Sequence, residues 1–338
     1  MLTKPMDILA QYPVRRSKAQ KQAFRDAVQT YAENLNYPVS VESGKFGSRN
    51  LIIGDPETAK YLVTAHYDTC AKIPFPNLLT PFSPVLFLLY QLLIAALLLL
   101  GAALLSFLVC ACVFLACLFL APLDSGLMIV LIVFLLWYVG FVIFGVLFFV
   151  LLYFGPANKN NANDNTSGVV TLLEIARTMP ETQRHKVCFV LFDLEEKGLW
   201  GSRSFRKLHK ETSDHQIVLN LDCVGDGDHI RMFPTKKLKE NRKMCTSLYN
   251  ACGYMGKKSI LVHEKGFGIY PSDQRHFPYG VGICALRKNK LCYYLGRIHT
   301  KRDTVLDEIN VNILRAALTS FICCDAVNQE RKMKNETV

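Results

Sequence analysis

One long apolar segment in the middle of the chain limits what it can fold into. Between Phe82 and Phe154 the only charged residue is Asp124. One membrane-spanning helix needs only about 20 predominantly apolar residues. The segment is therefore too long and too apolar for a core element of a soluble domain, and we expect it to enter a membrane. A soluble hydrophobic lid is the alternative.

A single turn signal divides the apolar segment. Residues 122–126 read PLDSG, and this combination of proline, polar residues and glycine favours a chain reversal. We expect two membrane-spanning helices, at residues 85–121 and 127–154. Four spans are the alternative, but the two further turns would have no polar residue to mark them.

The charge of the chain indicates on which side of the membrane its other parts lie. Lysine and arginine number 39, against 28 aspartate and glutamate residues, which gives a formal net charge of +11. Lys72 and Lys159 flank the apolar segment, whereas residues 122–126 contain no lysine or arginine. Because cytoplasmic loops carry an excess of positive residues, we expect an integral protein of the cytoplasmic membrane with its catalytic domain in the cytoplasm.

Other features of the composition agree with this location. The twelve cysteines show no spacing typical of a secreted disulfide framework, which indicates reduced thiols. The first residues, MLTKPM, lack the apolar core of a cleavable signal peptide. No nucleic-acid recognition motif is evident, so we attribute the positive charge to attraction by anionic lipid headgroups. The lipid bilayer is thus an expected partner, and nucleic acid is not.

Strand and helix patterns alternate outside the apolar segment. Strands are expected at residues 51–54, 61–65, 187–191, 217–221, 259–262 and 281–286, and helices at residues 18–35, 166–179, 199–211, 236–252 and 307–328. The first helix is amphipathic, with Phe24 and Val28 on its apolar side and Lys21 and Arg25 among its polar positions. The alternation predicts an α/β fold with a mixed, mainly parallel central sheet and helices on both faces.

The same pattern divides the chain into parts. We expect one discontinuous catalytic domain at residues 1–81 and 155–328. A transmembrane helical hairpin at residues 82–154 interrupts it, and a charged, disordered tail follows at residues 329–338.

Side chains that bind metals stand at the ends of several expected strands. His66 and Asp68 follow the strand at residues 61–65, and Asp222 follows the strand at residues 217–221. The pair Glu195 and Glu196 follows the strand at residues 187–191. Open α/β sheets bind ligands at the carboxyl ends of their strands, so these groups are expected to meet. His66 can ligate a metal through one ring nitrogen while Asp68 holds the other.

Two more residues complete the set. Asp164 stands before the helix at residues 166–179, where helix capping is its alternative role, and His299 follows residues 293–296. Two histidines, two aspartates and one glutamate suit a pair of zinc ions that share one carboxylate. Successive residues leaving a strand point in different directions, so Glu195 can serve as a general base while Glu196 binds metal.

Taken together, these residues resemble metallopeptidase family twenty-eight, the co-catalytic zinc aminopeptidases. The matching motifs are His66-Tyr67-Asp68, NANDNTSG at residues 161–168, Glu195-Glu196 with Gly198 and Gly201-Ser202, Asn220-Leu221-Asp222, Ser272-Asp273, and His299-Thr300 with Asp303-Thr304. The resemblance covers most of residues 38–325 apart from the apolar segment.

The resemblance implies a role for each site residue. Asp164 would bridge two zinc ions, with His66 and Asp222 on one ion and Glu196 and His299 on the other. Glu195 would be the general base that deprotonates the bridging water, and Asp68 would orient His66. Because His66 and Asp164 lie on either side of the apolar segment, the chain must return on the same side of the bilayer, and the number of spans must be even.

Two positions depart from the family pattern. Ile298 stands where some members have tyrosine before the last histidine ligand, and Gln274 follows Ser272-Asp273 where histidine is common. Both departures concern the substrate pocket and the group that stabilises the oxyanion. Tyr270 is a candidate for the missing phenol, and a packing role is its alternative.

Three functions are therefore considered. The first is a membrane-anchored, zinc-dependent exopeptidase, an aminopeptidase that hydrolyses N-terminal residues from short peptides by a metal-bridged hydroxide. The second is a glutaminyl-cyclase-like acyltransferase with a single zinc, against which the five-ligand set argues. The third is a non-catalytic membrane scaffold with a peptidase-like domain, which would be expected to lack a ligand or the base.

Overall fold

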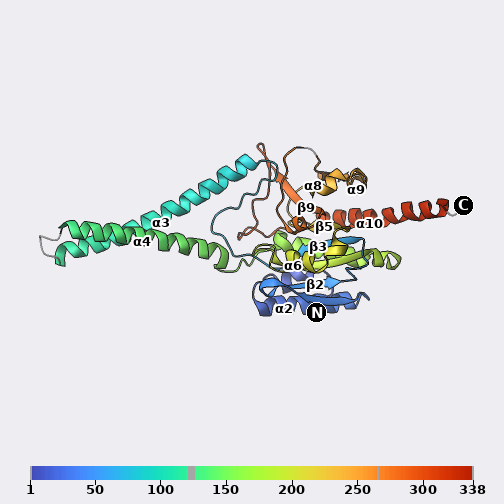
Figure 1. The fold of residues 1–338 in the computed structure, drawn as a ribbon, viewed down its shortest axis with the longest axis horizontal. Helices are drawn as coiled ribbons and strands as arrows, with labels where there is room; N and C mark the ends of the chain where they lie inside the picture. The colour runs from blue at the N-terminus through green and yellow to red at the C-terminus, as the bar shows by residue number, and fades with distance from the viewer. Residues whose placement is uncertain (1, 121–125, 265, 337–338) are drawn as a thin grey trace. The chain divides into compact units, whose positions relative to one another are not determined.

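The computed structural model describes residues 2–120, 126–264 and 266–336, which fall into two compact units (Figure 1). The first unit joins Met1–Ser83 to Ala157–Val338, and the second is Pro84–Pro156. Phe82, which the sequence assigns to the hairpin, belongs to the first unit. Its ring packs against the ring of Phe233 with centroids 5.3 Å apart.

The first unit is built around one mixed sheet. Its strand order is β1-β2-β4-β3-β5-β9-β6-β8-β7, with β10 paired to β9. The strands are β1 (Val39–Ser43), β2 (Arg49–Ile53), β3 (Tyr61–His66), β4 (Val187–Phe192), β5 (Ile217–Leu221), β6 (His229–Pro234), β7 (Gly253–Met255), β8 (Lys258–Val262), β9 (Tyr279–Lys288) and β10 (Tyr293–Tyr294). The central strands β4, β3, β5 and β9 are parallel, as are β6 and β8, and the other neighbours are antiparallel. The predicted mixed α/β sheet is confirmed.

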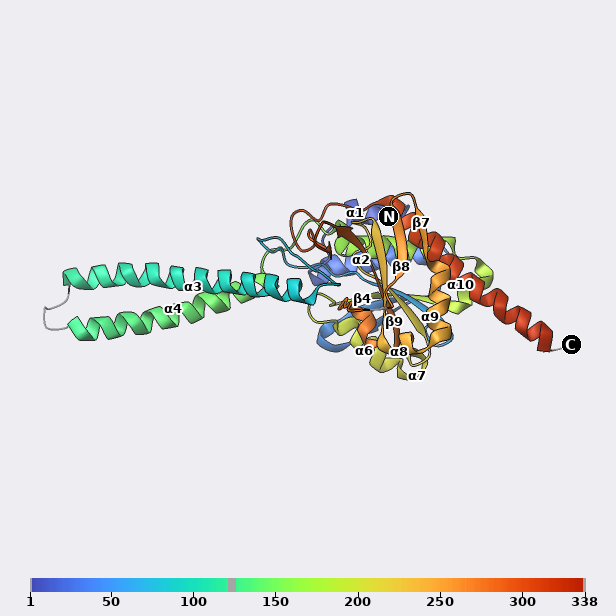
Figure 2. The same ribbon diagram turned by 90° about the horizontal axis from the view of Figure 1, so that it is seen from above.

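Helices cover both faces of the sheet, as predicted. Successive strand residues point to opposite faces, and β3 accordingly places Val63 in one apolar cluster and Leu62 in another. The cluster of Val63 contains residues of α2 (Lys18–Glu33), α5 (Gly168–Thr178) and α10 (Glu308–Glu336), and the cluster of Leu62 contains Phe205 of α6 (Trp200–Leu208). Figure 2 shows α10 running past α9 (Arg242–Leu248) and the strands β7 and β8.

Three helices differ from their predicted bounds. The helix expected at residues 236–252 is divided into α8 (Lys236–Glu240) and α9, because the Asn241 side chain accepts a hydrogen bond from the Met244 amide at 3.2 Å and begins a new helix. The helix expected at residues 199–211 is divided into α6 and α7 (Lys210–Ser213). Helix α10 continues to Glu336 and so extends into the segment from Gln329 that the sequence analysis assigns to the tail. Residues 329–336 include good helix formers and no glycine or proline.

The polar side of α2 is also different from the prediction. Lys21 and Arg25 are buried rather than solvated. The Lys21 ammonium pairs with Asp193 Oδ1 at 2.7 Å, and Arg25 Nη1 donates to the hydroxyl of Tyr67 at 2.6 Å. Charged side chains can be buried when they are paired in this way, and here they fasten α2 to the chain just beyond β3 and β4.

The second unit consists of α3 (Pro84–Leu120) and α4 (Gly126–Phe154), which lie side by side in Figures 1 and 2. The expected turn at residues 122–126 lies almost wholly outside the described residues. The spans Pro84–Cys117 and Met128–Phe154 are long and apolar enough to cross a membrane. In the most apolar 18-residue stretch of each span, only 11% and 0% of the residues are buried. A core helix of a soluble protein would be mostly buried, so this exposure argues against that role.

Small residues line the contact between the two long helices. Ala102, Ser106 and Cys110 are buried and stand four residues apart, on one face of α3. The Ser106 hydroxyl donates to the carbonyl of Trp137 at 2.5 Å, and a Cβ atom added to Gly140 would lie 2.5 Å from Ser106 Oγ. Small residues that allow close backbone approach are typical of helix pairs in membranes.

Candidate active site

The central strands deliver the predicted site residues to one edge of the sheet. Strand β3 ends at His66, and its neighbour β5 is followed directly by Asp222. His66 also pairs in register with Phe192, the last residue of β4, and Glu195 and Glu196 follow shortly after. The parallel register therefore brings together side chains that are more than 150 positions apart in the sequence.

Asp164 lies between the two histidines. Its Oδ1 atom is 3.2 Å from His66 Nε2, and its Oδ2 atom is 2.9 Å from His299 Nε2. Asp164 belongs to an irregular π-helical turn, Ala162–Ser167, in which it has non-helical φ and ψ angles, and the amide of Gly168 at the start of α5 donates to Asn165 Oδ1 instead, at 3.1 Å. The alternative role of Asp164 as a helix cap is therefore wrong, and its two oxygens have the placement that a bridging ligand needs.

Two groups of donor atoms surround Asp164. On one side, His66 Nε2 is also 3.6 Å from Asp222 Oδ1. On the other side, His299 Nε2 is also 3.2 Å from Glu196 Oε2. The donor atoms of His66, Asp164 and Asp222 all lie within 4.8 Å of one another. The structure thus brings all five predicted ligands into one cluster.

The donor set fits metal ions. Nitrogen and carboxylate oxygen are the ligands that zinc takes in catalytic sites. The carboxylates of the cluster outnumber its two histidines, and buried charges of one sign are costly without a cation. In addition, Glu196 Oε1 is buried and has no hydrogen-bond partner among the described residues, although buried polar atoms normally have one.

The pKa values of the cluster reflect the same crowding. Burial would raise the pKa of Asp164, but hydrogen bonds with His299 and His66 outweigh it and hold the pKa well below its usual value. Burial raises the pKa of Glu196 to about 8 and that of Glu195 well above its ordinary range. For His299, burial lowers the pKa, but Glu196 and Asp164 outweigh it and raise the pKa to about 10.

Glu195 differs from its neighbour Glu196. Its carboxylate forms no ion pair among the described residues, it is only half-buried, and one of its oxygens lies within 4.8 Å of a His66 nitrogen. The preceding residue, Leu194, has φ +55°, in the left-handed region that β-carbon-bearing residues rarely adopt. This turn is held by Asp193, whose Oδ1 atom accepts the Leu194 amide at 2.9 Å.

Asp68 does more than its predicted role. Its Oδ1 and Oδ2 atoms accept the backbone amides of Glu195 and Glu196 at 3.0 and 3.3 Å. His66 Nδ1 is nearer to the Asp68 carbonyl oxygen, at 3.2 Å, than to Asp68 Oδ1, at 3.6 Å. Asp68 therefore orients His66 through its main chain, and its carboxylate holds the glutamate pair in place.

Asp303 holds the other side of the site in the same way, a role that the sequence did not predict. Its two oxygens accept the amides of Asn163 at 2.7 Å and Asp164 at 3.0 Å. Burial raises the pKa of Asp303 to about 7, and Asp164 adds to this effect. The only signal in the sequence is that Asp303 follows His299 within the matched motif.

Two asparagines fix the loop that carries Asp222. Asn165 accepts the Cys223 amide at 3.2 Å and donates to the Leu221 carbonyl at 2.9 Å. Asn163 accepts the amides of Gly225 and Asp226 at 2.7 and 3.1 Å. The turn around Asp164 is thus joined directly to the end of β5.

A buried cation lies behind the cluster. Arg15 is fully buried, its Nη1 atom donates to the Tyr12 carbonyl at 2.7 Å, and its Nε atom donates to the Tyr67 carbonyl at 2.5 Å. Burial lowers the pKa of Arg15 to about 10, while Asp68 and Asp164 oppose this effect. Arg15 remains a cation at neutral pH and offsets part of the negative charge of the site.

The positions that depart from the family pattern offer no free polar group to the site. The Tyr270 hydroxyl donates to the carbonyl of Asp222 at 3.2 Å, so the structure supports the packing role. Gln274 donates to the Tyr270 carbonyl at 2.6 Å and accepts from Asn220 at 3.1 Å. Ile298 is buried in the same apolar cluster as Tyr270.

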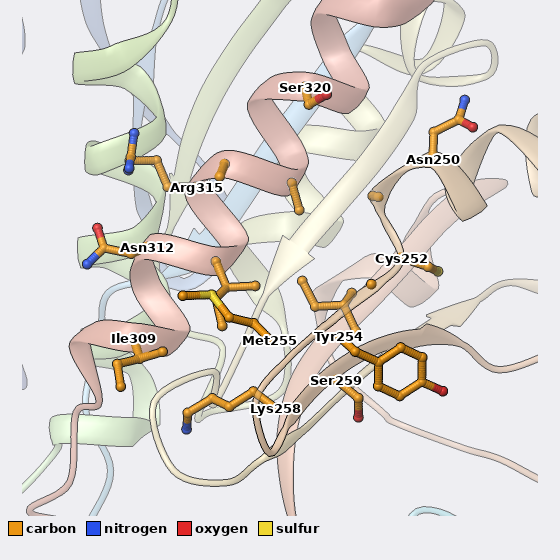
Figure 3. Close-up of a pocket in the computed structure, with 16 residues that line it drawn as sticks. Asn250, Cys252, Tyr254, Met255, Lys258, Ser259, Ile309, Asn312, Arg315 and Ser320 are labelled. Atoms are coloured by element: carbon orange, nitrogen blue, oxygen red, sulfur yellow. The ribbon is translucent and has the colours of Figure 1, made fainter.

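A separate cavity of about 580 Å³ lies between α10 and the strands β7 and β8 (Figure 3). Tyr254 and Met255 line it from β7, and Arg315 from α10. Among its described lining residues, Cys252 is the only His, Cys, Asp or Glu, and none of the cluster residues contributes to it. We therefore do not assign this cavity to the active site.

The sequence profile described as Peptidase family M28 matches residues 151–320. A segment of 67 residues, or 19% of the chain, is 39% identical to Aminopeptidase YwaD of Bacillus subtilis (strain 168), and the match spans only 15% of that protein.

Two solved structures illustrate the similarity of fold. The LapA aminopeptidase of Legionella pneumophila superposes with a TM-score of 0.55 at 14% identity, covering 94% of this chain and 67% of that one. The glutaminyl cyclase of Porphyromonas gingivalis superposes with a TM-score of 0.56 at 16% identity, covering 95% and 96%. At these identities the likeness concerns the fold alone.

Proposed function

Since this chain belongs to peptidase family M28, we propose that it is a membrane-anchored, zinc-dependent exopeptidase, an aminopeptidase that removes N-terminal residues from short peptides. The observation that carries this proposal is the placement of Asp164 between His66 and His299, with its two oxygens 3.2 and 2.9 Å from their Nε2 atoms. One zinc ion would be held by His66, Asp164 and Asp222, and the other by Asp164, Glu196 and His299.

The ions and the side chains would have different roles in the reaction. Zinc bound at such a pair of sites polarises a peptide carbonyl and lowers the pKa of water. Glu195 takes the proton of the attacking water on its carboxylate and later gives it to the leaving amine. Burial raises the pKa of Glu195 well above its ordinary range, so its carboxylate takes up a proton more readily than that of an exposed glutamate.

Asp68 and Asp303 position the groups that react. By accepting the amides of Glu195 and Glu196, Asp68 fixes the general base relative to a metal ligand. By accepting the amides of Asn163 and Asp164, Asp303 fixes the shared carboxylate. General bases work only when they are held within hydrogen-bond reach of the proton that they take.

A glutaminyl-cyclase-like acyltransferase with one zinc and a non-catalytic scaffold are the two rival proposals. The fold is compatible with the first, since the structure of a glutaminyl cyclase is similar over 96% of its length. Two donor groups that share Asp164 favour two ions over one. A scaffold would not be expected to retain both a full ligand set and the unpaired base Glu195.

One experiment separates these functions. The detergent-solubilised chain is analysed for metal and screened against free-amine peptides, N-blocked peptides and peptides that begin with glutamine. We expect two zinc ions per chain and cleavage of the free-amine peptides only. One zinc ion with cyclisation of N-terminal glutamine would favour the acyltransferase, and bound metal without any turnover would favour the scaffold.

Membrane anchoring by α3 and α4, with the catalytic unit in the cytoplasm, is part of the proposal. The exposure of their apolar side chains supports insertion, and Lys72 and Lys159 support the cytoplasmic orientation. Among the described residues, no cysteine forms a disulfide, in agreement with a reducing compartment. Two reporters fused after Val338 in a bacterial host test the orientation. A fluorescent protein, which matures in the cytoplasm, should be fluorescent, and a phosphatase that folds only in the periplasm should be inactive. The opposite pair of results would contradict the cytoplasmic orientation.

A further inference from the structure

A cysteine lies at the edge of the candidate metal centre and has no role so far. Cys70 stands two residues beyond Asp68 and is buried. Its Sγ atom, a carboxylate oxygen of Glu196 and a ring nitrogen of His299 all lie within 4.8 Å of one another. Among the described residues, no cysteine is grouped in this way with His66, Asp164 and Asp222.

The backbone holds Cys70 at this place. Its carbonyl accepts the Asn158 amide at 3.2 Å, and the next residue, Ala71, forms an isolated β-bridge with Ala157. Three residues after Cys70, the Ile73 amide donates to the His299 carbonyl at 2.9 Å. The loop that carries Cys70 is thus bonded to the loop that carries His299, so the two side chains are fixed relative to each other.

An independent observation points to a ligand at the same place. The Glu196 side chain is only 9% exposed, and its Oε1 atom has no hydrogen-bond partner among the described residues. The Cys70 thiol itself makes only a long contact, 3.7 Å, with Asn161 Oδ1. A metal ion between Glu196, His299 and Cys70 would give the buried oxygen a partner and cost the thiol only that weak contact.

We propose that Cys70 is a further ligand of the metal ion bound by Glu196 and His299. This inference rests on the metal centre of the proposed function. When the sulfur binds, the thiol proton leaves to solvent, because the thiolate is the metal ligand. This ion then has four protein ligands: Asp164, Glu196, His299 and Cys70.

The consequence is that the two ions have different ligand sets. Structural zinc sites are closed by four protein ligands, whereas catalytic sites keep a position open. With four protein ligands, the ion held by Cys70 and His299 would be the more tightly held of the two, and it could bind the shared water only by taking a fifth ligand. The ion held by His66 and Asp222 would keep the open position next to Glu195. A thiolate ligand would also favour zinc over manganese or magnesium at the site of Cys70 and His299.

X-ray absorption at the zinc edge tests the proposal on the full chain in detergent. We expect a sulfur atom at about 2.3 Å in addition to nitrogen and oxygen at about 2.0–2.2 Å. After replacement of zinc by cobalt, we also expect a thiolate-to-cobalt charge-transfer band. Both signals should disappear in Cys70→Ser. The dissociation constant of one of the two ions should also rise at least about 10-fold, because even the loss of a residue that only holds a metal ligand in place weakens metal binding by about 10-fold or more.

Cys223→Ser is the matched control. Cys223 is equally buried and directly follows Asp222, but it belongs to no group of metal donors among the described residues. The control should keep both signals and both ions. The proposal is overturned if the sulfur signal is absent from the wild type, if it persists in Cys70→Ser, or if the preparation binds no metal. A sulfur signal without peptidase activity would overturn the proposed function and leave this inference standing.

Discussion

Glu195 is the residue on which the proposed chemistry depends. Glu195→Gln keeps the size of the side chain but removes the proton acceptor, so turnover should fall about 10²–10⁴-fold while the metal content stays the same. Glu196→Gln should lower the metal content as well. Steady-state kinetics and metal analysis of both variants test this assignment, and near-normal turnover of Glu195→Gln would contradict it.

His276 gives the stability of the chain a pH dependence. Burial, followed by Arg275 and Arg203, lowers its pKa from 6.5 to about 4. The folded state therefore binds fewer protons than the unfolded state. This contribution to stability is fully present above about pH 6.5 and is lost as the pH falls towards 4. The unfolding temperature should fall across this window, and less so in His276→Gln; equal acid sensitivity of the two proteins would be contrary to this expectation.

The sequence predicts all five candidate ligands and the candidate base, and four of these six residues stand at or just beyond strand ends. His66, Asp222, Glu195 and Glu196 were visible because parallel strands bring their carboxyl ends to one edge. Asp303, Arg15 and Cys70 were not assigned a role. Their contacts join segments far apart in the chain, and no local pattern encodes such contacts.

At the scale of elements, the two aspartate carboxylates act as clamps between loops. Asp68→Ala and Asp303→Ala each leave two backbone amides without their acceptor. An unsatisfied buried amide costs about 1–3 kcal/mol, and we expect each variant to lose at least that much stability and some of its metal. Chemical unfolding measures the loss. Asp214→Ala, which breaks the outlying ion pair with Arg206, should cost only about 0–1 kcal/mol; a loss as small as this in Asp303→Ala would refute the clamp.

Helix α4 offers a pair of glycines that tests the hairpin. A Cβ atom at Gly140 would lie 2.5 Å from Ser106 Oγ of α3, whereas a Cβ atom at Gly145 would have no atom within 4 Å. Gly140→Leu should therefore separate the helices and cost about 1–3 kcal/mol, as overpacking does elsewhere, while Gly145→Leu should be nearly neutral. Thermal unfolding of the full chain in detergent compares the two. Equal effects would mean that the helices do not pack as described.

Two of the strands that the sequence missed, β1 and β7, share a physical property. Strand β1 is a largely exposed edge strand whose residues include Ser40, Glu42 and Ser43, and β7 is exposed throughout. Such strands lack the apolar run that predicted β3, β4 and β5. Asn241 divides a continuous helical pattern by a single side-chain hydrogen bond, which propensity alone does not reveal.

At the scale of the whole molecule, the first unit should fold without the hairpin. The Ala71–Ala157 bridge and the hydrogen bond from the Asn158 amide to the Cys70 carbonyl hold together the two chain segments that lead to the hairpin. Replacement of residues 84–156 by a short polar loop retains Phe82 and its contact with Phe233. We expect a soluble protein with the metal content of the full chain and a similar kcat/KM for soluble peptides. Failure to fold or to bind metal would show that the hairpin is more than an anchor.

The position of the hairpin between His66 and Asp164 also determines the order in which the candidate site is synthesised. During translation, His66 leaves the ribosome before the apolar segment, and Asp164, Glu196, Asp222 and His299 leave after it. No complete centre exists until the segment has been synthesised and the later strands have joined β3. If the chain is the aminopeptidase proposed above, it should therefore have no activity before the apolar segment and the later strands have been made.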